Sequence, residues 1–279
     1  MRFGRSVGAL CTTSLLTFSL LLAGCASETS GTASNVRAQI DAAAGEILLP
    51  LEAYAMNQGD ERDVGHANAL LTNRCLNETG RNFPRATQNW DAIPAYPDRR
   101  YGVWSKKDAV ANGYELPEAK DAKSLAEQEE SLGEDWWAAY EKCRSDLQLF
   151  PLMGINTVMD PSPVDIGMQE SFEALLASPE FARIRDEWKS CIVAAGLTPD
   201  PDSALMVPKI PTSAEDQLRV AAADVECKES QNSVQPLADF EAQKQASYIK
   251  KHESELTNYR NEVDKVLESA KKVITTNGG

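Results

Sequence analysis

The fold is decided near the C-terminal end, where residues 236–274 read PLADFEAQKQASYIKKHESELTNYRNEVDKVLESAKKVI. Pro236 suits the first turn of a helix, and neither Gly nor a second Pro follows before Gly278. Residues at alternating steps of three and four form a heptad seam: Ile249, His252, Leu256, Tyr259, Val263, Val266, Ala270 and Val273. The stretch predicts one amphipathic helix about 58 Å long, whose seam packs on a helix of this chain or of a partner.

Shorter helices are expected upstream, because apolar residues recur three or four positions apart between start and stop signals. Ser105 with Asp108 resembles a capping box, and Pro179 fits the first turn of a helix. The expected ranges are 60–79, 105–113, 134–149, 178–196 and a helix capped by Thr212. Pro-rich segments 83–104, 151–166 and 197–211 are interpreted as connections, and no run of alternating β-branched residues predicts a strand. The predicted fold class is therefore all-α.

Four of the six cysteines lie in the body of the chain: Cys75, Cys143, Cys191 and Cys227. An even number of cysteines outside the cytoplasm predicts two disulfides, with three connectivities to choose from. A zinc site is the alternative, but the C-x₂-C spacing that such sites use is absent. His66 and His252 are not at ligand spacing from any of the four. We therefore expect disulfides and predict no metal or cofactor.

An internal similarity favours one connectivity. Cys75 and Cys191 each begin a Cys-x₄-Gly segment at an expected helix end, and Cys143 and Cys227 each end an Ala-x₃-Cys segment. Two helical hairpins, each closed by a disulfide, are the simplest physical account of this duplication. They would pair Cys75 with Cys143 and Cys191 with Cys227. The predicted architecture is thus two disulfide-stapled helical hairpins, in regions 36–150 and 151–279, with the long helix at the end of the second.

The N-terminal segment has the features of an export signal. Arg2 and Arg5 precede an apolar run from Val7 to Leu22, which ends in Leu-Ala-Gly-Cys at Cys25. This pattern predicts a lipoprotein signal peptide over 1–24, cleaved after Gly24, with a lipid on Cys25. Residues 25–35 are small and polar, as in a flexible tether. The alternatives are an ordinary secretory signal or a single membrane-spanning anchor, although about 16 apolar residues are few for a span.

The charge of the chain limits its partners. After removal of Arg2 and Arg5 with the signal, 26 basic residues remain against 42 acidic ones, a net charge of −16. Such a surface disfavours nucleic acid. Residues 115–141 alone hold nine Asp or Glu against two Lys, which we interpret as a solvated helical face. The expected partners are therefore the membrane, through the lipid on Cys25, and a protein of the envelope.

Several segments together resemble a known group of proteins. They are Trp188-x₂-Cys191-x₄-Gly196, Ala223-x₃-Cys227, Arg100-Tyr101-Gly102 and Ala111-x-Gly113-Tyr114. The chain is similar, over roughly 50–275, to secreted lipoproteins of high-GC Gram-positive (actinobacterial) bacteria. The first Cys-x₄-Gly copy departs from the pattern, because no Trp precedes Cys75 at the matching position. The resemblance implies an accessory role at the cell surface, near export machinery in some members.

A search for catalytic patterns favours no enzyme class. The sequence has no H-E-x-x-H and no G-x-x-x-x-G-K-[ST], and two histidines leave little room for a His-based relay. His252 is interpreted as a polar residue at the edge of the seam. A group of aromatic and Arg residues between 83 and 114 is the better candidate binding site. Its members are Trp90, Tyr96, Arg100, Tyr101, Trp104 and Tyr114, and packing of the loop on the helices is the alternative role.

Three functions follow as hypotheses. The first is a lipid-anchored, non-enzymatic binding or accessory protein on the extracytoplasmic face of the cell membrane, with a transport or export complex as its candidate partner. The second is a solute-binding lipoprotein of an importer, which normally needs two α/β lobes. The third is a cell-wall glycan hydrolase that uses carboxylates.

Overall fold

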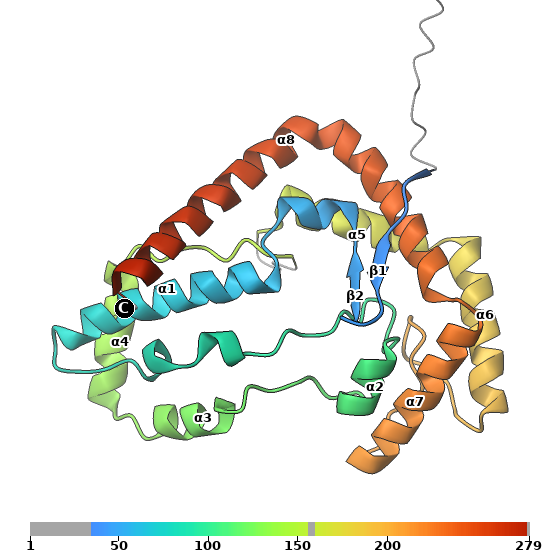
Figure 1. The fold of residues 1–279 in the computed structure, drawn as a ribbon, viewed down its shortest axis with the longest axis horizontal. Helices are drawn as coiled ribbons and strands as arrows, with labels where there is room; N and C mark the ends of the chain where they lie inside the picture. The colour runs from blue at the N-terminus through green and yellow to red at the C-terminus, as the bar shows by residue number, and fades with distance from the viewer. Residues whose placement is uncertain (1–34, 156–159, 278–279) are drawn as a thin grey trace, which may run out of the picture. The chain divides into compact units, whose positions relative to one another are not determined.

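A computed structural model describes residues 35–155 and 160–277 (Figure 1). The predicted signal peptide, its cleavage at Gly24, the lipidated Cys25 and the tether up to residue 34 lie outside the described residues. The described residues form eight α-helices and a few 3₁₀ turns. The helices are α1 (Gln58–Asn77), α2 (Lys106–Asn112), α3 (Ala122–Glu130), α4 (Glu134–Asp146), α5 (Pro163–Leu176), α6 (Pro179–Ala194), α7 (Ala214–Ser230) and α8 (Val234–Asn277). The all-α class is confirmed.

A short antiparallel ribbon is the exception to the helical pattern. β1 (Gln39–Asp41) pairs with β2 (Glu46–Leu48), with Ile40 opposite Ile47. This ribbon corrects the expectation that the chain has no strand. Three residues per strand are too few to produce a recognisable alternation, and the turn depends on Gly45, which has a φ of +79°.

Local capping explains most helix boundaries. Ser178 accepts a hydrogen bond from the Phe181 amide, with Pro179 in the first turn of α6, as expected. In α7 the cap is Ser213, which accepts from the Asp216 amide, so the expected cap at Thr212 is wrong by one residue. Either hydroxyl would suit a cap, and the sequence pattern does not distinguish neighbouring hydroxyls.

α5 is a correction to the Pro-rich connection expected over 151–166, because the helix begins at Pro163 within that segment. Ser162 and Asp165 form a capping box, and Pro163 occupies the first turn of the helix. Proline at this position needs no amide partner, because the first amides of a helix have none within the helix. Pro163 therefore starts α5 where we expected a loop to continue.

The long C-terminal helix is confirmed, with two corrections. α8 begins at Val234, two residues before Pro236, and it bends at His252, whose φ of −115° and ψ of 21° are not helical. Figure 1 shows the bend in the red-orange helix labelled α8. His252 stacks on Tyr248 with ring centroids 4.1 Å apart, and its Nδ1 lies 3.1 Å from Glu255 Oε2. It is thus a partly exposed residue at the bend.

The two halves of α8 pack on different helices. The first half contacts α5, and the second half lies along α1. In the second half, Val263, Leu267 and Ala270 are buried against Val64 and Ala67 of α1. Leu267 lies outside the predicted heptad seam, because a straight helix repeats every 3.6 residues and its buried stripe drifts away from a 3.5-residue repeat. The heptad seam was expected to pack on a helix of this chain or of a partner. In its second half the helix it packs on is α1 of the same chain.

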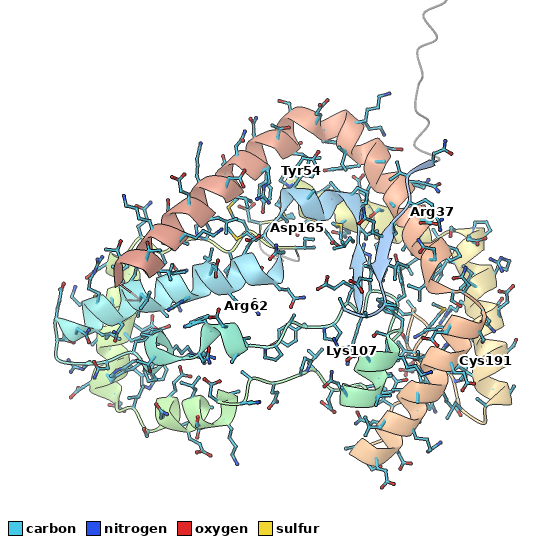
Figure 2. The ribbon with its side chains drawn as sticks, viewed as in Figure 1. Arg37, Tyr54, Arg62, Lys107, Asp165 and Cys191 are labelled. Carbon is cyan, nitrogen blue, oxygen red and sulfur yellow. A yellow bond between two sulfur atoms is a disulfide. The ribbon has the colours of Figure 1, made fainter. Side chains whose placement is uncertain are left out.

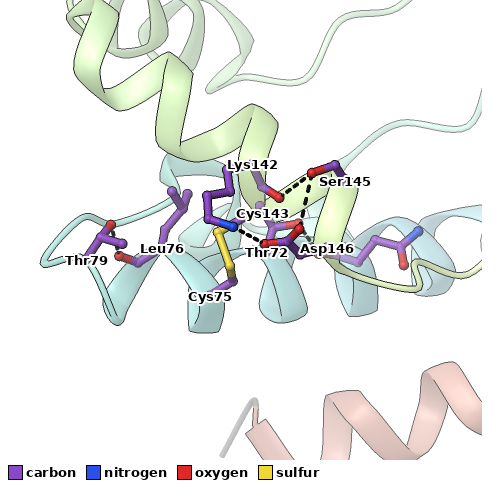
Figure 3. The surroundings of a disulfide bond; sticks show 9 residues. Thr72, Cys75, Leu76, Thr79, Lys142, Cys143, Ser145 and Asp146 are labelled. Carbon is purple, nitrogen blue, oxygen red and sulfur yellow. Dashed lines mark hydrogen bonds and ion pairs between the residues drawn. A yellow bond between two sulfur atoms is a disulfide. The ribbon is translucent and has the colours of Figure 1, made fainter.

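Both disulfides form as the internal similarity predicted. Cys75 of α1 bonds to Cys143 of α4 across 68 residues (Figure 3), and Cys191 of α6 bonds to Cys227 of α7 across 36. The two Cys-x₄-Gly segments also end their helices in the same way. Gly80 and Gly196 have φ of +73° and +76°, and the amide after each glycine donates to a carbonyl five residues earlier. Both are Schellman-type ends, so the duplication is one of local structure as well as sequence.

Replacing Cys191 and Cys227 together by Ser should lower the free energy of unfolding by about 4 kcal/mol, because the bond restricts the unfolded chain over its loop. The same change at Cys75 and Cys143 should cost a similar amount. Urea unfolding of each double variant, compared with the unaltered protein, measures both losses. A loss below about 1 kcal/mol for either pair would contradict the expected restriction of the unfolded chain by that bond.

Candidate functional site

The segment 98–104 crosses the interior and is held by two buried polar centres. The first is an ion pair between Arg100 and Glu241 of α8. Arg100 Nε donates to Glu241 Oε1 at 2.7 Å and Nη2 donates to Oε2 at 2.5 Å, while the Glu241 side chain is fully shielded from water. Two parallel hydrogen bonds of this kind fix the orientation of both groups as well as their distance.

Further donors complete the bonding of the Glu241 carboxylate. The Tyr101 hydroxyl donates to Oε1 at 2.6 Å, and the Ser171 hydroxyl of α5 lies 3.3 Å from Oε2. Gln245, one helical turn after Glu241, donates to Ser171 and accepts from the Leu51 amide. We call these five side chains the Glu241 centre. It joins α5, α8, the 98–104 segment and the turn that begins at Pro50.

The second centre surrounds Asp224 of α7. Its carboxylate accepts from Trp188 Nε1 at 2.8 Å, from Lys228 Nζ at 3.0 Å and from the Tyr114 hydroxyl at 3.1 Å. The Lys228 ammonium also donates to the carbonyl of Val103 at 2.7 Å. We call these four side chains the Asp224 centre. Three of its members, Trp188, Asp224 and Tyr114, come from three of the four sequence segments on which the resemblance rests.

The two centres meet at Gly102, whose φ is +83°. A Cβ at this position would lie 2.7 Å from the Met206 carbonyl oxygen and 2.9 Å from Lys228 Nζ. Only glycine fits a backbone conformation and an approach of this kind. Gly102 therefore lets the Arg100-Tyr101-Gly102 segment pass between the two centres, one facing α8 and the other facing α7.

Burial shifts the pKa values of the groups in both centres. It raises the pKa of Asp224 and lowers that of Lys228, and the hydrogen bonds that Asp224 accepts oppose its shift. Burial also raises the pKa of the Tyr101 and Tyr114 hydroxyls, and the neighbouring carboxylates add to this effect. Both tyrosines therefore remain neutral donors. The hydrogen bonds and ion pairs of the two centres therefore hold the segment 98–104 in position.

A pair of half-buried acids lies beside the Glu241 centre. Burial and the nearby Asp98 raise the pKa of Glu52 from 4.5 to about 7. Burial also raises the pKa of Asp98, although Asp98 accepts from the Arg100 amide at 2.8 Å. Glu52 is therefore the carboxylate in this region that can exchange a proton near neutral pH.

The six predicted binding residues do not form one surface. Arg100, Tyr101 and Trp104 lie in or beside the Glu241 centre, where Tyr101 and Trp104 are buried and Trp104 Nε1 donates to the Asp98 carbonyl. Tyr114 belongs to the Asp224 centre. The contacts of these four residues are those of the alternative role given above, in which the segment packs on the helices.

Trp90 and Tyr96 lie on the α1 side of the structure. Trp90 stacks on His66 with ring centroids 5.5 Å apart. Arg62, labelled in Figure 2, donates to the Ile93 carbonyl, and Gln58 exchanges two hydrogen bonds with the backbone of Tyr96. Tyr96 is 52% exposed, so it is the one of the six with most of its surface open to a partner.

Sequence reasoning missed the carboxylates that organise the site, although a signal existed. Asp224 and Lys228 continue a buried stripe of α7 at helical spacing from Gln217 and Ala221. Glu241 and Gln245 continue the buried stripe of α8 in the same way. Polar residues at core positions of a helical pattern indicate buried partners, because unpaired burial is costly.

Within the described residues, no group of three or more His, Cys, Asp or Glu side chains is placed to hold a metal ion. The helices of the same residues include none that is both long enough and apolar enough to cross a bilayer. Comparisons with protein-family models, curated proteins and solved structures found no match to the chain. The binding roles of the six residues stay predictions.

Replacing Glu241 by Gln should lower the free energy of unfolding by about 3 kcal/mol, because Arg100 is then buried without its counter-charge. In that background, Arg100→Met should cost at least about 1 kcal/mol less than in the unaltered protein, since the pair is already broken. Urea unfolding of the two single variants and the double variant measures the coupling. Glu187→Gln, which breaks an exposed pair with Arg183, is the control and should cost little. Additive losses at Arg100 and Glu241 would contradict the central role of the pair.

The raised pKa of Glu52 predicts a pH-dependent stability. Between pH 4.5 and about 7 the folded protein binds more protons at Glu52 than the unfolded chain does, so stability falls as pH rises through this window. Glu52→Gln should remove that fall and be more stable than the unaltered protein at pH 8. Thermal unfolding at pH 5 and pH 8 measures the difference, with exposed Glu253→Gln as the control. Equal pH profiles for the unaltered protein and Glu52→Gln would contradict the shift.

Proposed function

We propose that the protein is a lipid-anchored lipoprotein on the extracytoplasmic face of the cell membrane, with a non-enzymatic accessory or binding role in the envelope. The observation that carries the proposal is the pair of disulfides, Cys75–Cys143 and Cys191–Cys227. Structural disulfides persist in oxidising compartments, which agrees with the export signal before Cys25. The likeness to actinobacterial lipoproteins is part of this proposal.

The attachment of the tether to the body supports an anchored protein. The Ala38 amide and the Arg37 guanidinium both bond to Asp239 of α8 at 3.0 Å, and Arg37 is labelled beside α8 in Figure 2. Residues 37 and 38, which follow the tether predicted over 25–35, are therefore bonded to the long helix. A load applied through a lipid on Cys25 would reach α8, which contacts α1 and α5.

The accessory role is favoured over the alternatives by how the polar groups are used. Arg100, Glu241, Asp224 and Lys228 all hold buried partners, which suits a rigid scaffold better than a reacting centre. The importer alternative depends on two α/β lobes, whereas the sheet of the described residues is one ribbon of two three-residue strands. The glycan hydrolase would need a carboxylate pair facing a sugar-sized cleft. No contact of Glu52 and Asp98 specifically favours that use.

Fractionation of cells that make the full chain tests this proposal. The protein should be acylated, sediment with membranes and, after mild detergent, co-purify with a second envelope protein. Cys25→Ser should lose the acyl group and leave the membrane fraction, whereas Ser27→Ala, the control, should behave as the unaltered protein. Membrane retention of Cys25→Ser would contradict the anchor. Recovery of the acylated protein alone from several mild detergents would contradict the accessory role.

A further inference from the structure

An exposed tryptophan on α4 has no role in the contacts described so far. Trp137 is 41% exposed, whereas its neighbour Trp136 is buried and stacks on Phe83. Trp136 and Cys143 form the buried side of α4, where the disulfide joins this helix to α1. Trp137 thus lies at the edge of the first hairpin and keeps much of its surface open to solvent.

The indole N–H of Trp137 differs from those of the other four tryptophans. Trp90, Trp104, Trp136 and Trp188 each donate to an acceptor of this chain, at distances from 2.7 to 3.1 Å. Trp137 has no such acceptor among the residues that the structure describes. Tryptophan is enriched at the centres of protein interfaces, where its ring is covered and its N–H finds a partner.

Neighbouring rings hold Trp137 in one orientation. Trp136 and Tyr140 stack on each other with ring centroids 5.3 Å apart. Trp137 stands nearly perpendicular to both, with centroid distances of 4.9 Å to Trp136 and 5.6 Å to Tyr140. Edge-to-face contacts of this kind are favourable. A ring that is fixed before binding loses little conformational freedom when a partner covers it.

Two glutamates flank Trp137 along α4. Glu134 lies three residues before it and Glu141 four residues after it, a spacing that places all three side chains on one side of the helix. Both glutamates are exposed, and neither forms an ion pair with a described residue. Lys142, the lysine of α4, is paired with Asp146 instead. The two carboxylates beside the Trp137 ring therefore have no cation of this chain to neutralise them.

α6 shows what the same spacing does when a cation occupies the middle position. There Arg183 bonds to Glu180, three residues earlier, and to Glu187, four residues later, both at 2.7 Å. In α4 the middle position holds Trp137, whose ring attracts cations through its negative face. The two glutamates of α4 and the ring between them thus match a cation that comes from outside the chain.

We propose that the face of α4 around Trp137 binds an arginine side chain in a basic segment of a partner protein. The guanidinium lies on the Trp137 ring and donates to Glu134 and Glu141. Arginine suits this face better than lysine, because its planar group stacks on an aromatic ring and donates hydrogen bonds in two directions. The inference rests on the accessory role proposed above and names the chemistry of the partner.

Two further observations agree with a basic partner. Arg144, one turn after Tyr140, has its guanidinium carbon 5.8 Å from the centroid of that ring, so a cation already lies on an aromatic ring of this helix. The excess of acidic over basic residues in the chain also attracts a basic segment and speeds its approach.

Fluorescence anisotropy of a labelled peptide on the detergent-solubilised full chain tests the site. The probe is a short Gly-Ser peptide with two arginines, and the matched control carries citrulline, which keeps the shape without the charge. The arginine peptide should bind at least about fivefold more tightly at low salt, and added salt should reduce the difference. Equal affinities would overturn the proposal. Tighter binding of an N-acetylglucosamine trimer would also overturn it and assign the face to a glycan.

Variants of the ring and of the carboxylates locate the binding. Trp137→Leu, which stays apolar but has no aromatic face, should weaken binding of the arginine peptide about threefold. Glu134→Gln combined with Glu141→Gln should weaken it by a similar factor. The control, Glu253→Gln combined with Glu262→Gln, removes the same charge from exposed positions of α8 and should have less effect. Unchanged affinity in Trp137→Leu, or equal losses in the two double variants, would overturn the proposal. Circular dichroism checks that each variant is folded.

Co-purification from membranes separates this inference from the accessory role on which it rests. Trp137→Leu should lose the second envelope protein that the unaltered protein retains. Retention by Trp137→Leu would leave the accessory role intact and overturn the face of α4 as the docking site. Absence of a second protein from both preparations would contradict the accessory role, and the peptide titration would then decide the α4 site by itself.

Discussion

The pairing of Arg100 with Glu241 is the interaction on which the arrangement of the chain depends. The Glu241 side chain is completely shielded from water, and a buried carboxylate without a counter-charge would cost several kcal/mol. The partner comes from 141 residues earlier in the chain. The segment 98–104 must therefore reach α8 before the first half of that helix can be buried. Hydrophobic packing alone would accept many positions of this segment, whereas two parallel hydrogen bonds accept one.

The Asp224 centre adds a second constraint on the same segment from the other side. Lys228 ties the Val103 carbonyl to α7, and Tyr114 and Trp188 bring α6 and the end of α2 to the same carboxylate. The Cys191–Cys227 bond closes α6 on α7 next to this centre. Covalent closure and buried polar bonding thus act on the same pair of helices. The first hairpin differs, because its disulfide lies beside an aromatic group that includes Phe83, Trp136 and Tyr140.

The sequence predicts features that are encoded within a short stretch of chain. It does not predict features that depend on a partner far away in the sequence. Helix periodicity, the Cys-x₄-Gly ends and the disulfide pairing were all readable, because each is encoded within a few residues of a helix end. The Glu241 and Asp224 centres were not, since the identity of a partner 141 or 110 residues away has no local signature. The aromatic and Arg residues of 83–114 are of the types that occur at binding surfaces, which is why the sequence predicts a binding site there. In the structure Tyr101 and Trp104 are buried, so these side chains contact the interior of the protein and not a partner.

A difference of two residues at the start of α8 changes which residue occupies the cap position of the helix. If Pro236 were the first residue of the helix, as its conformation suggests, Gln235 would be the cap and Ser233 would lie outside the helix. With the start at Val234, Ser233 takes the cap position and Pro236 falls where the amide that bonds to a serine cap should be. Proline tolerates this position, because the amide there needs no partner inside the helix. The cost falls on Ser233, whose buried hydroxyl has no hydrogen-bond partner among the described residues.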